Sequence, residues 1–198
     1  MEPTNLTKYD LLLKHYGNKY TNFDLFFQTY EGLFVFSRID IVYNVLQTLL
    51  DMHIISTDST FVETGSGDGR IVALASIMGF SSFGIEISND MTDISNGHLN
   101  QLKNENIIAM NNPAKIVQGD FLKNETYTKI DHKFDEIDIF FNYYTNTELI
   151  TSKVEKEGKK GCILISVSLS KKAVKTTMEI IHSTSLPDRN HYLFVYKK

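Results

Sequence analysis

From residue 60 onward, short runs of apolar residues alternate with longer segments in which apolar residues recur every three or four positions. Short apolar runs between turn signals predict buried strands, whereas the longer period predicts amphipathic helices. The expected strands cover residues 60–63, 82–87, 115–117, 136–141 and 162–169. Helices are expected over residues 70–78 and 147–156. A third helix lies between them, and its apolar face is expected to consist of Met91, Ile94, His98, Leu99 and Leu102.

The end of the chain breaks this alternation. Residues 174–183 and 191–196 both predict strands, and the turn-forming residues 186–190 lie between them. Strands that alternate with helices form a mostly parallel sheet with helices on both faces, and a final hairpin adds antiparallel strands. We therefore expect an α/β, Rossmann-like, doubly wound seven-stranded sheet with a terminal antiparallel hairpin. Such sheets bind ligands beyond the carboxyl ends of the strands, where the strand order reverses.

The segment before the first of these strands carries apolar positions at helical spacing, and an amphipathic helix is expected over residues 40–52. Residues 23–36 are unusually aromatic. A helix packed on the core would explain these rings, and a lid over a pocket is the alternative. We expect an N-terminal helical extension or lid over residues 1–55 and a core over residues 56–198, which together form one structural domain.

Composition narrows the class of protein. The 198 residues are 42% hydrophobic and 22% charged, with a formal net charge of -4. This balance argues against tight, non-specific nucleic-acid binding, which depends on lysine and arginine. The single cysteine, Cys162, lies in an apolar run and is expected to be a buried thiol. Without a signal peptide or an apolar run long enough for a membrane span, a cytoplasmic protein with no membrane association is expected.

A glycine-rich string from Phe61 to Arg70 follows the first expected strand. Glycines at positions 65, 67 and 69 permit a tight turn and let a ligand approach the backbone. The helix that follows offers unpaired N–H groups at its start. A dinucleotide fingerprint needs a further glycine where this chain has Arg70, and no Gly-Lys-Ser/Thr follows for an ATP-binding P-loop.

Acidic residues end three of the expected strands, which favours S-adenosylmethionine as the cofactor. Glu63 precedes the loop and is placed to meet the ammonium end of a methionine moiety. Glu86 is placed to accept hydrogen bonds from both ribose hydroxyls, and Asp120 from the adenine amino group. Taken singly, Asp120 or Asp68 is explained as a strand-end or helix-cap residue. The expected cofactor-binding residues are Glu63, Gly65, Ser66, Gly67, Asp68, Gly69, Glu86, Ile87, Asp120 and Phe121.

The string from Glu63 to Val72 resembles the loop of small archaeal and mitochondrial protein-lysine methyltransferases of the seven-strand, class I type. Residues 119–122 and 139–144 resemble the non-SET histone-lysine methyltransferases. Residues 34–38 resemble the segment that precedes the first strand in the protein-lysine methyltransferases, but Phe36 and Arg38 stand where prolines are usual. Residues 29–32 resemble the Tyr-Gly-Glu loop of the histone enzymes only loosely. The resemblance implies that an Asn-containing aromatic segment lines the methyl-transfer channel, here Asn142, Tyr143 and Tyr144 as the candidate catalytic residues.

The resemblance implies transfer of a methyl group to a protein lysine. A lysine must lose its proton before it attacks, and an aromatic, water-poor channel favours the neutral amine. A methyltransferase acting on RNA or a small metabolite is one alternative, and a cofactor-binding module without catalysis is another. An adenine-N6 methyltransferase is disfavoured because Asn142-Tyr143-Tyr144 lacks two prolines. The six histidines have no cysteine or acidic partner at ligand spacing, so no metal centre is expected.

Overall fold

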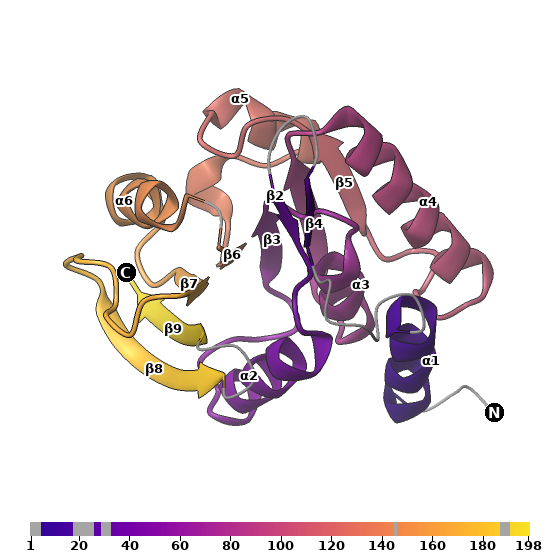
Figure 1. Ribbon diagram of the computed structural model, residues 1–198, viewed down its shortest axis with the longest axis horizontal. Coiled ribbons are helices and arrows are strands. Elements are labelled where there is room, and N and C mark those ends of the chain that lie inside the picture. Colours follow the sequence, from indigo (N-terminus) through magenta and orange to yellow (C-terminus); the bar gives the residue numbers. More distant parts are fainter. Residues whose placement is uncertain (1–4, 18–25, 29–32, 145, 187–190) are drawn as a thin grey trace.

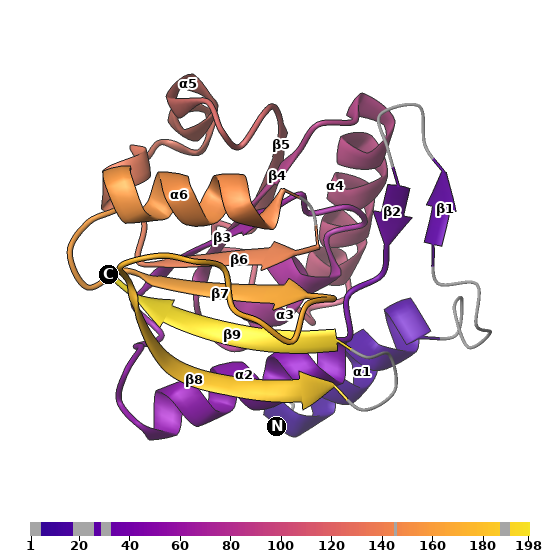
Figure 2. The same cartoon turned by 60° about the vertical axis from the view of Figure 1, so that its left-hand side comes forward.

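The computed structural model describes the backbone of residues 5–17, 26–28, 33–144, 146–186 and 191–198. Within this part of the chain, a seven-stranded sheet has the order β5-β4-β3-β6-β7-β9-β8 (Figures 1 and 2). The five strands from β5 to β7 run parallel, and β9 lies antiparallel between β7 and β8. The strands are β3 (Thr60–Thr64), β4 (Ser81–Glu86), β5 (Lys115–Gln118), β6 (Ile139–Tyr143), β7 (Ile163–Ser168), β8 (Glu179–Leu186) and β9 (His191–Lys197). The predicted fold class is confirmed.

Strand order reverses between β3 and β6. The chain runs outward from β3 to β4 and β5, and then returns to the other side of β3 with β6 and β7. Thr64 at the end of β3 is opposite Asn142 in β6. Figure 2 shows the carboxyl ends of the parallel strands gathered at one edge of the sheet. This is the edge at which a doubly wound sheet binds its ligand.

Helices cover both faces of the sheet, and each face has its own apolar core. The helices α1 (Asn5–Gly17), α2 (Ile39–Asp51), α3 (Arg70–Ile77) and α4 (Asn89–Asn104) contribute to one core. Two further helices, α5 (Asn124–Tyr127) and α6 (Thr147–Glu157), and the 3-10 turns η1 (Thr128–Ile130) and η2 (Phe134–Glu136) contribute to the other. Successive residues of β6 separate the two cores, since Phe140 packs in the second and Phe141 in the first. Cys162 is buried, as expected.

Two expected strands begin later than their sequence pattern suggested. Residues 136–138 precede β6, because η2 takes up residues 134–136 and pairing with β3 starts at Ile139. Residues 174–178 do not pair in the sheet, because N–H groups in this segment are hydrogen-bonded to side chains instead. Val174 donates to the Tyr196 hydroxyl at 3.0 Å, and Thr177 donates to Glu155 Oε1 at 2.6 Å. The intervening turn at 187–190 lies outside the described residues.

The helical interpretation of the aromatic segment is wrong where the structure describes it. Phe26–Gln28 forms β1 and Leu33–Val35 forms β2, and the two pair antiparallel. Aromatic and β-branched residues favour extended backbone, which outweighs the apolar spacing here. The other residues of this segment, 23–25 and 29–32, lie outside the described part of the chain.

The buried face of α4 also differs from the expected one, because Ile94 is 50% exposed while Ser95 faces the core.

Candidate cofactor and acceptor site

The glycine loop connects the end of β3 to the start of α3. Gly65, Gly67 and Gly69 have φ of 79°, 52° and 79°, in the left-handed region that favours glycine. The N–H groups of Gly65 and Ser66 both donate to the Ile85 carbonyl, at 2.8 and 3.1 Å. The N–H of Gly69 donates to the Ser66 carbonyl at 2.9 Å. The loop is therefore a tight turn fastened to the neighbouring strand β4.

Glu86 at the end of β4 holds this loop with its side chain. One carboxylate oxygen accepts the Gly67 N–H at 2.8 Å, and the other accepts the Ser88 N–H at 3.0 Å. The residue is buried. A carboxylate has about four acceptor positions, so two remain for hydroxyl groups of a ligand. The predicted ribose contact of Glu86 stays a prediction, and the structure adds a second role in shaping the loop.

Glu63 is a buried acid beside the loop. It is 2% exposed, and its Oε2 accepts no hydrogen bond from any described residue. Burial raises the pKa of Glu63 well above its ordinary value, and the nearby carboxylates of Asp68 and Glu86 raise it further. Arg70 acts in the opposite direction. A buried acceptor without a donor is costly, so this oxygen marks a place where a positively charged donor would be stabilised.

Asp68 and Arg70 form a buried ion pair within the loop and the start of α3. The guanidinium Nη2 lies 2.6 Å from Asp68 Oδ2, and Nε lies 3.0 Å from Oδ1. The Arg70 guanidinium carbon lies 4.4 Å from the centre of the Phe36 ring and 5.5 Å from that of Tyr16. In the sequence, Arg70 served only to exclude a dinucleotide fingerprint. The position of Arg70 two residues after Asp68 was the available signal for this ion pair.

The other predicted cofactor residues lie at the carboxyl ends of β4 and β5. Asp120 is half-buried, and its Oδ1 accepts the Leu122 N–H at 2.9 Å. This contact is the strand-end role considered from the sequence, and it leaves the second carboxylate oxygen for other donors. Phe121 is buried and Ile87 is half exposed. The predicted adenine contact of Asp120 stays a prediction.

Asn142 is fully buried at the point where the strand order reverses. Its amide nitrogen donates to Thr64 Oγ1 at 3.0 Å, and its amide oxygen accepts the Thr147 hydroxyl at 3.2 Å. The side chain therefore links β6 both to the residue before the glycine loop and to the first turn of α6. Tyr143 is buried as well, and Tyr144 is half-buried.

His191 joins these aromatic residues from the start of β9. Its Nε2 is hydrogen-bonded to the Tyr144 hydroxyl, and the two ring centres lie 4.7 Å apart. The ring centres of Tyr143 and Tyr144 are 5.4 Å apart. Tyr144 has a φ of 70°, which is uncommon for a residue with a side chain. Sequence reasoning missed His191 as part of this group, because no local pattern links residues separated by 47 positions.

The charges and space around the loop fit S-adenosylmethionine. Three buried carboxylates, Glu63, Asp68 and Glu86, surround the loop, and Arg70 lies among them with its guanidinium paired to Asp68. The ammonium and sulfonium groups of the cofactor would offset the remaining negative charge. A side-chain carbon built on Gly65 meets no atom within 4 Å, which leaves room for a ligand against the backbone. Ser66 Oγ is also buried and has no hydrogen-bond partner among the described residues.

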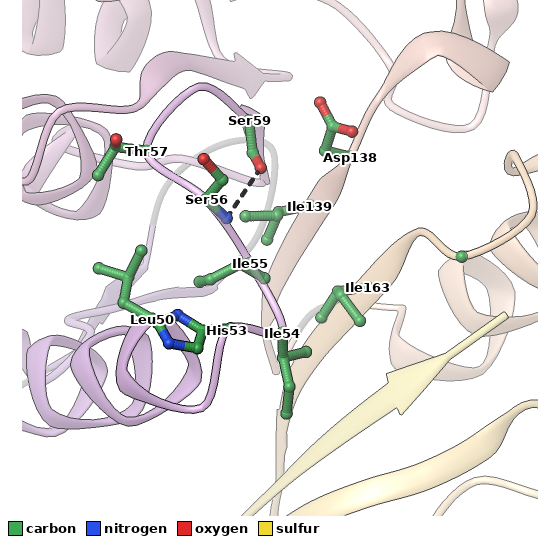
Figure 3. Close-up of a pocket in the computed structure, with 11 residues that line it drawn as sticks. Leu50, His53, Ile54, Ile55, Ser56, Thr57, Ser59, Asp138, Ile139 and Ile163 are labelled. Carbon is green, nitrogen blue, oxygen red and sulfur yellow. Dashed lines mark hydrogen bonds between the residues drawn. The ribbon is translucent and has the colours of Figure 1, made fainter.

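A cavity of about 530 Å³ lies at the opposite edge of the sheet, at the starts of β6 and β7 (Figure 3). Its acid, Asp138, already accepts the Thr60 N–H at 2.8 Å and pairs with Lys159 at 2.5 Å. The Ser56 N–H donates to Ser59 Oγ at 3.4 Å. These polar groups are satisfied within the protein, unlike Glu63 at the carboxyl edge.

The strand order, the glycine loop and the strand-end acids define the class I, seven-strand methyltransferases that use S-adenosylmethionine. The chain belongs to the family described as histone methylation protein DOT1, whose sequence profile matches residues 27–196. It is thus an S-adenosylmethionine-dependent methyltransferase. No curated protein matches the chain in sequence at a significant level.

Solved methyltransferase structures share the fold at low sequence identity. The rRNA methyltransferase aviRa from Streptomyces viridochromogenes has a TM-score of 0.63 at 6% identity, over 89% of this chain and 90% of that chain. An RNA methyltransferase from Salinibacter ruber, in complex with S-adenosyl-L-homocysteine, has a TM-score of 0.51 at 15% identity, over 78% and 90%. Geranyl diphosphate C-methyltransferase from Streptomyces coelicolor has a TM-score of 0.54 at 11% identity, over 80% of each chain. Such identities show a shared fold and leave the acceptor open.

Among the described residues, no three His, Cys, Asp or Glu side chains come together in a way that could hold a metal ion. No helix in this part of the chain is both long and apolar enough to cross a membrane.

Proposed function

We propose that this methyltransferase methylates the side-chain nitrogen of a lysine in a protein. The observation that carries the proposal is the aromatic group of Tyr143, Tyr144 and His191, which follows Asn142 at the carboxyl end of β6. Asn142 is bonded to Thr64, the residue before the glycine loop. The strand end that carries the aromatic group is therefore held next to the residue that precedes the cofactor loop. The family description, which names histone methylation, also favours a protein acceptor.

The residues of this chain have separate tasks in the proposed reaction. When bound, S-adenosylmethionine supplies a methyl group already activated by the sulfonium, so the protein needs mainly to bind and orient the reactants. Glu63 would hold the ammonium group, Glu86 the ribose and Asp120 the adenine. Tyr143 and Tyr144 would form the wall along which the acceptor enters.

The aromatic wall suits an amine acceptor for two physical reasons. A lysine ammonium is disfavoured where water is excluded, so burial next to the tyrosine rings lowers its pKa and increases the neutral, nucleophilic form. Ring faces also attract a cation before it loses its proton, and the methylated product carries a positive charge again. Neither property would help a hydroxyl or carbon nucleophile.

Transfer of labelled methyl groups tests this function directly. Purified protein is incubated with methyl-tritiated S-adenosylmethionine and cell lysate, and the products are treated separately with protease and with RNase. We expect label that protease releases, RNase does not, and acid hydrolysis yields as methyl-lysine. Label confined to RNA or to small metabolites would contradict the proposal.

A pair of substitutions at Tyr144 separates acceptor binding from cofactor binding. Tyr144→Ala removes the ring and should lower kcat/KM for the protein acceptor by on the order of tenfold, equivalent to ~1.4 kcal/mol. Tyr144→Phe keeps the ring and should lose less. The Kd for S-adenosylmethionine, measured by calorimetry, should stay the same in both variants. A weaker Kd in Tyr144→Ala would place this residue in the cofactor site instead.

A further inference from the structure

A cavity of about 540 Å³ opens beside Tyr144 at the carboxyl edge of the sheet. One wall is the first turn of α6, which contributes Thr147, Glu148 and Leu149. The other wall is the segment 168–175, which leaves the end of β7 and runs toward β8. Figure 2 shows this segment passing below α6 on the near side of the sheet. The cavity therefore continues outward from the aromatic group that follows Asn142.

The two walls carry opposite charges. Lys172 and Lys175 line the cavity from the segment after β7, and both are exposed. Glu148 lines it from α6 and is exposed as well. Groups of opposite charge on facing walls select a ligand whose own charges alternate in the complementary order.

Exposed apolar side chains lie at the same place. Leu149 lines the cavity and is 53% exposed, and Leu169, between the lining residues Ser168 and Ser170, is 62% exposed. Single exposed leucines are common on protein surfaces, but two beside one cavity form an apolar contact point. The cavity thus combines an apolar contact with ammonium groups on one side and a carboxylate on the other.

We propose that this cavity binds the substrate residues that flank the methylated lysine, and that it selects a polypeptide with acidic residues next to an apolar one. The inference rests on the proposed protein-lysine activity and adds the sequence class of the substrate. Acidic side chains of the substrate pair with Lys172 and Lys175, and its apolar side chain covers Leu149. The approaching lysine passes Glu148 on its way to Tyr144.

A polypeptide suits this cavity better than a nucleic acid does. Phosphate recognition commonly uses the planar guanidinium of arginine, and the described lining residues include none. A nucleic acid carries a negative charge at every phosphate and would be repelled at Glu148, whereas a polypeptide can place acidic residues against Lys172 and Lys175 and a lysine beside Glu148. The exposed leucines offer contact to apolar side chains rather than to a sugar–phosphate chain.

A binding experiment tests the selectivity independently of catalysis. The probe is a fluorescein-labelled peptide with a central lysine flanked by glutamates and a leucine, and matched probes replace the glutamates with glutamine or lysine. We expect the acidic probe to bind the full-length protein on the order of tenfold more tightly than the glutamine probe in fluorescence anisotropy. Raising the ionic strength should reduce this difference, because salt screens exposed charges.

Reversing the charge of the two cavity lysines tests whether they cause the selectivity for acidic peptides. Lys172→Glu/Lys175→Glu should bring the acidic probe to the affinity of the glutamine probe, and Lys172→Gln/Lys175→Gln should give an intermediate loss. Lys156→Glu/Lys160→Glu is the matched control, because it makes the same change in net charge at exposed residues near the start of β7. The control should retain full selectivity, and melting temperatures should show that all three variants fold.

Methylation of the same peptides separates failure of this inference from failure of the proposed function. Methylation without regard to flanking charge, or selectivity that survives charge reversal, would overturn the inference and leave lysine methylation standing. Methylation of no peptide by a protein that binds S-adenosylmethionine would overturn both. Displacement of the acidic probe by an RNA oligonucleotide that itself becomes methylated would also reject the polypeptide. Preferential methylation of the acidic peptide, lost in the charge-reversed variant, would support the inference.

Discussion

Glu63, the last residue but one of β3, carries a carboxyl group that is buried from water. Its pKa is raised by burial first, and then by the carboxylates of Asp68 and Glu86. In the folded protein without cofactor, burial and these two carboxylates therefore disfavour the ionised form of Glu63. A cofactor ammonium next to the same oxygen would favour the ionised form, because an opposite charge at close range lowers a carboxyl pKa. Binding and ionisation of this one group are thus coupled.

Glu63→Gln should stabilise the cofactor-free protein at neutral pH. The folded-state pKa lies above the ordinary value of 4.5, so wild-type stability falls as pH rises from about that value toward the folded-state pKa. We therefore expect a gain in the free energy of unfolding, because the neutral amide removes the cost of keeping a charged carboxylate buried. Urea denaturation should show this gain at neutral pH and none below pH ~4.5, where the wild-type carboxyl is protonated in both states.

The same variant should bind S-adenosylmethionine on the order of tenfold more weakly, because a charge-assisted contact is lost. Wild-type binding should also release a proton, measurable by calorimetry in buffers of different ionisation enthalpy. Glu63→Gln should abolish that release. Proton release unchanged in the variant would assign the coupling to another group.

Glu86→Ala should damage both the loop and the cofactor site. The Gly67 and Ser88 N–H groups would lose their acceptors, and an unsatisfied buried donor costs ~1–3 kcal/mol. We expect lower stability in urea and weaker binding of S-adenosylmethionine in calorimetry. Unchanged affinity would show that Glu86 has only the loop-shaping role.

The glycine loop packs closely against strand β4 because Gly84 of β4 has no side chain. A side-chain carbon there would lie 2.6 Å from Ser66 Oγ, 2.7 Å from Ser66 Cβ and 2.8 Å from Ile116 Cγ1. The loop can rest on β4, with Gly65 and Ser66 bonded to the Ile85 carbonyl, only because that carbon is missing. A glycine in the middle of a strand is otherwise unfavourable.

Gly84→Ala should therefore displace the loop. Overpacking of this kind costs ~1–3 kcal/mol, and we expect a matching loss of affinity for S-adenosylmethionine in calorimetry. Gly97→Ala is the control, since a side-chain carbon at this position of α4 meets nothing within 4 Å. It should leave affinity unchanged and raise stability by ~0.4–1 kcal/mol. Equal affinities in the two variants would contradict the role of Gly84.

At the scale of the whole molecule, the N-terminal helix α1 and the sheet share one core. Leu12 and Tyr16 of α1 are buried in the same cluster as residues of α3 and β6. Tyr16 lies beside Arg70, which pairs with Asp68 in the cofactor loop. A continuous set of contacts therefore links the packing of α1 to the position of the cofactor loop.

Substitution of neighbouring leucines in α1 tests this connection. Leu12 is fully buried, so Leu12→Ala should lower the free energy of unfolding by ~2–5 kcal/mol. Leu11 is 38% exposed, so Leu11→Ala should change it by less than ~0.5 kcal/mol. Thermal unfolding of Leu12→Ala should remain a single transition at a lower temperature. A minor early transition with the main one unchanged would show that α1 is a separate appendage.

Elements with a clear local signal were predictable from the sequence, and elements that depend on distant partners were less so. The glycine turn, α3 and the parallel strands follow from apolar spacing and backbone freedom at Gly65 and Gly69. The expected strand over 174–183 failed at its start, because the backbone there bonds to Glu155 and Tyr196 rather than to β9. Residues 26–28 and 33–35 were expected to be helical, and they pair as strands instead.

The sequence alone determined the fold class and the cofactor, because both depend on patterns carried by neighbouring residues: apolar periodicity, three glycines and an acid at or near the end of three strands. The tertiary structure alone decided which side chains meet across the site. It brings His191 to Tyr144, Arg70 to Phe36 and Asn142 to Thr64. Such pairs form where elements from different parts of the chain become neighbours in the fold, and the spacing of residues along the sequence does not show which elements will do so.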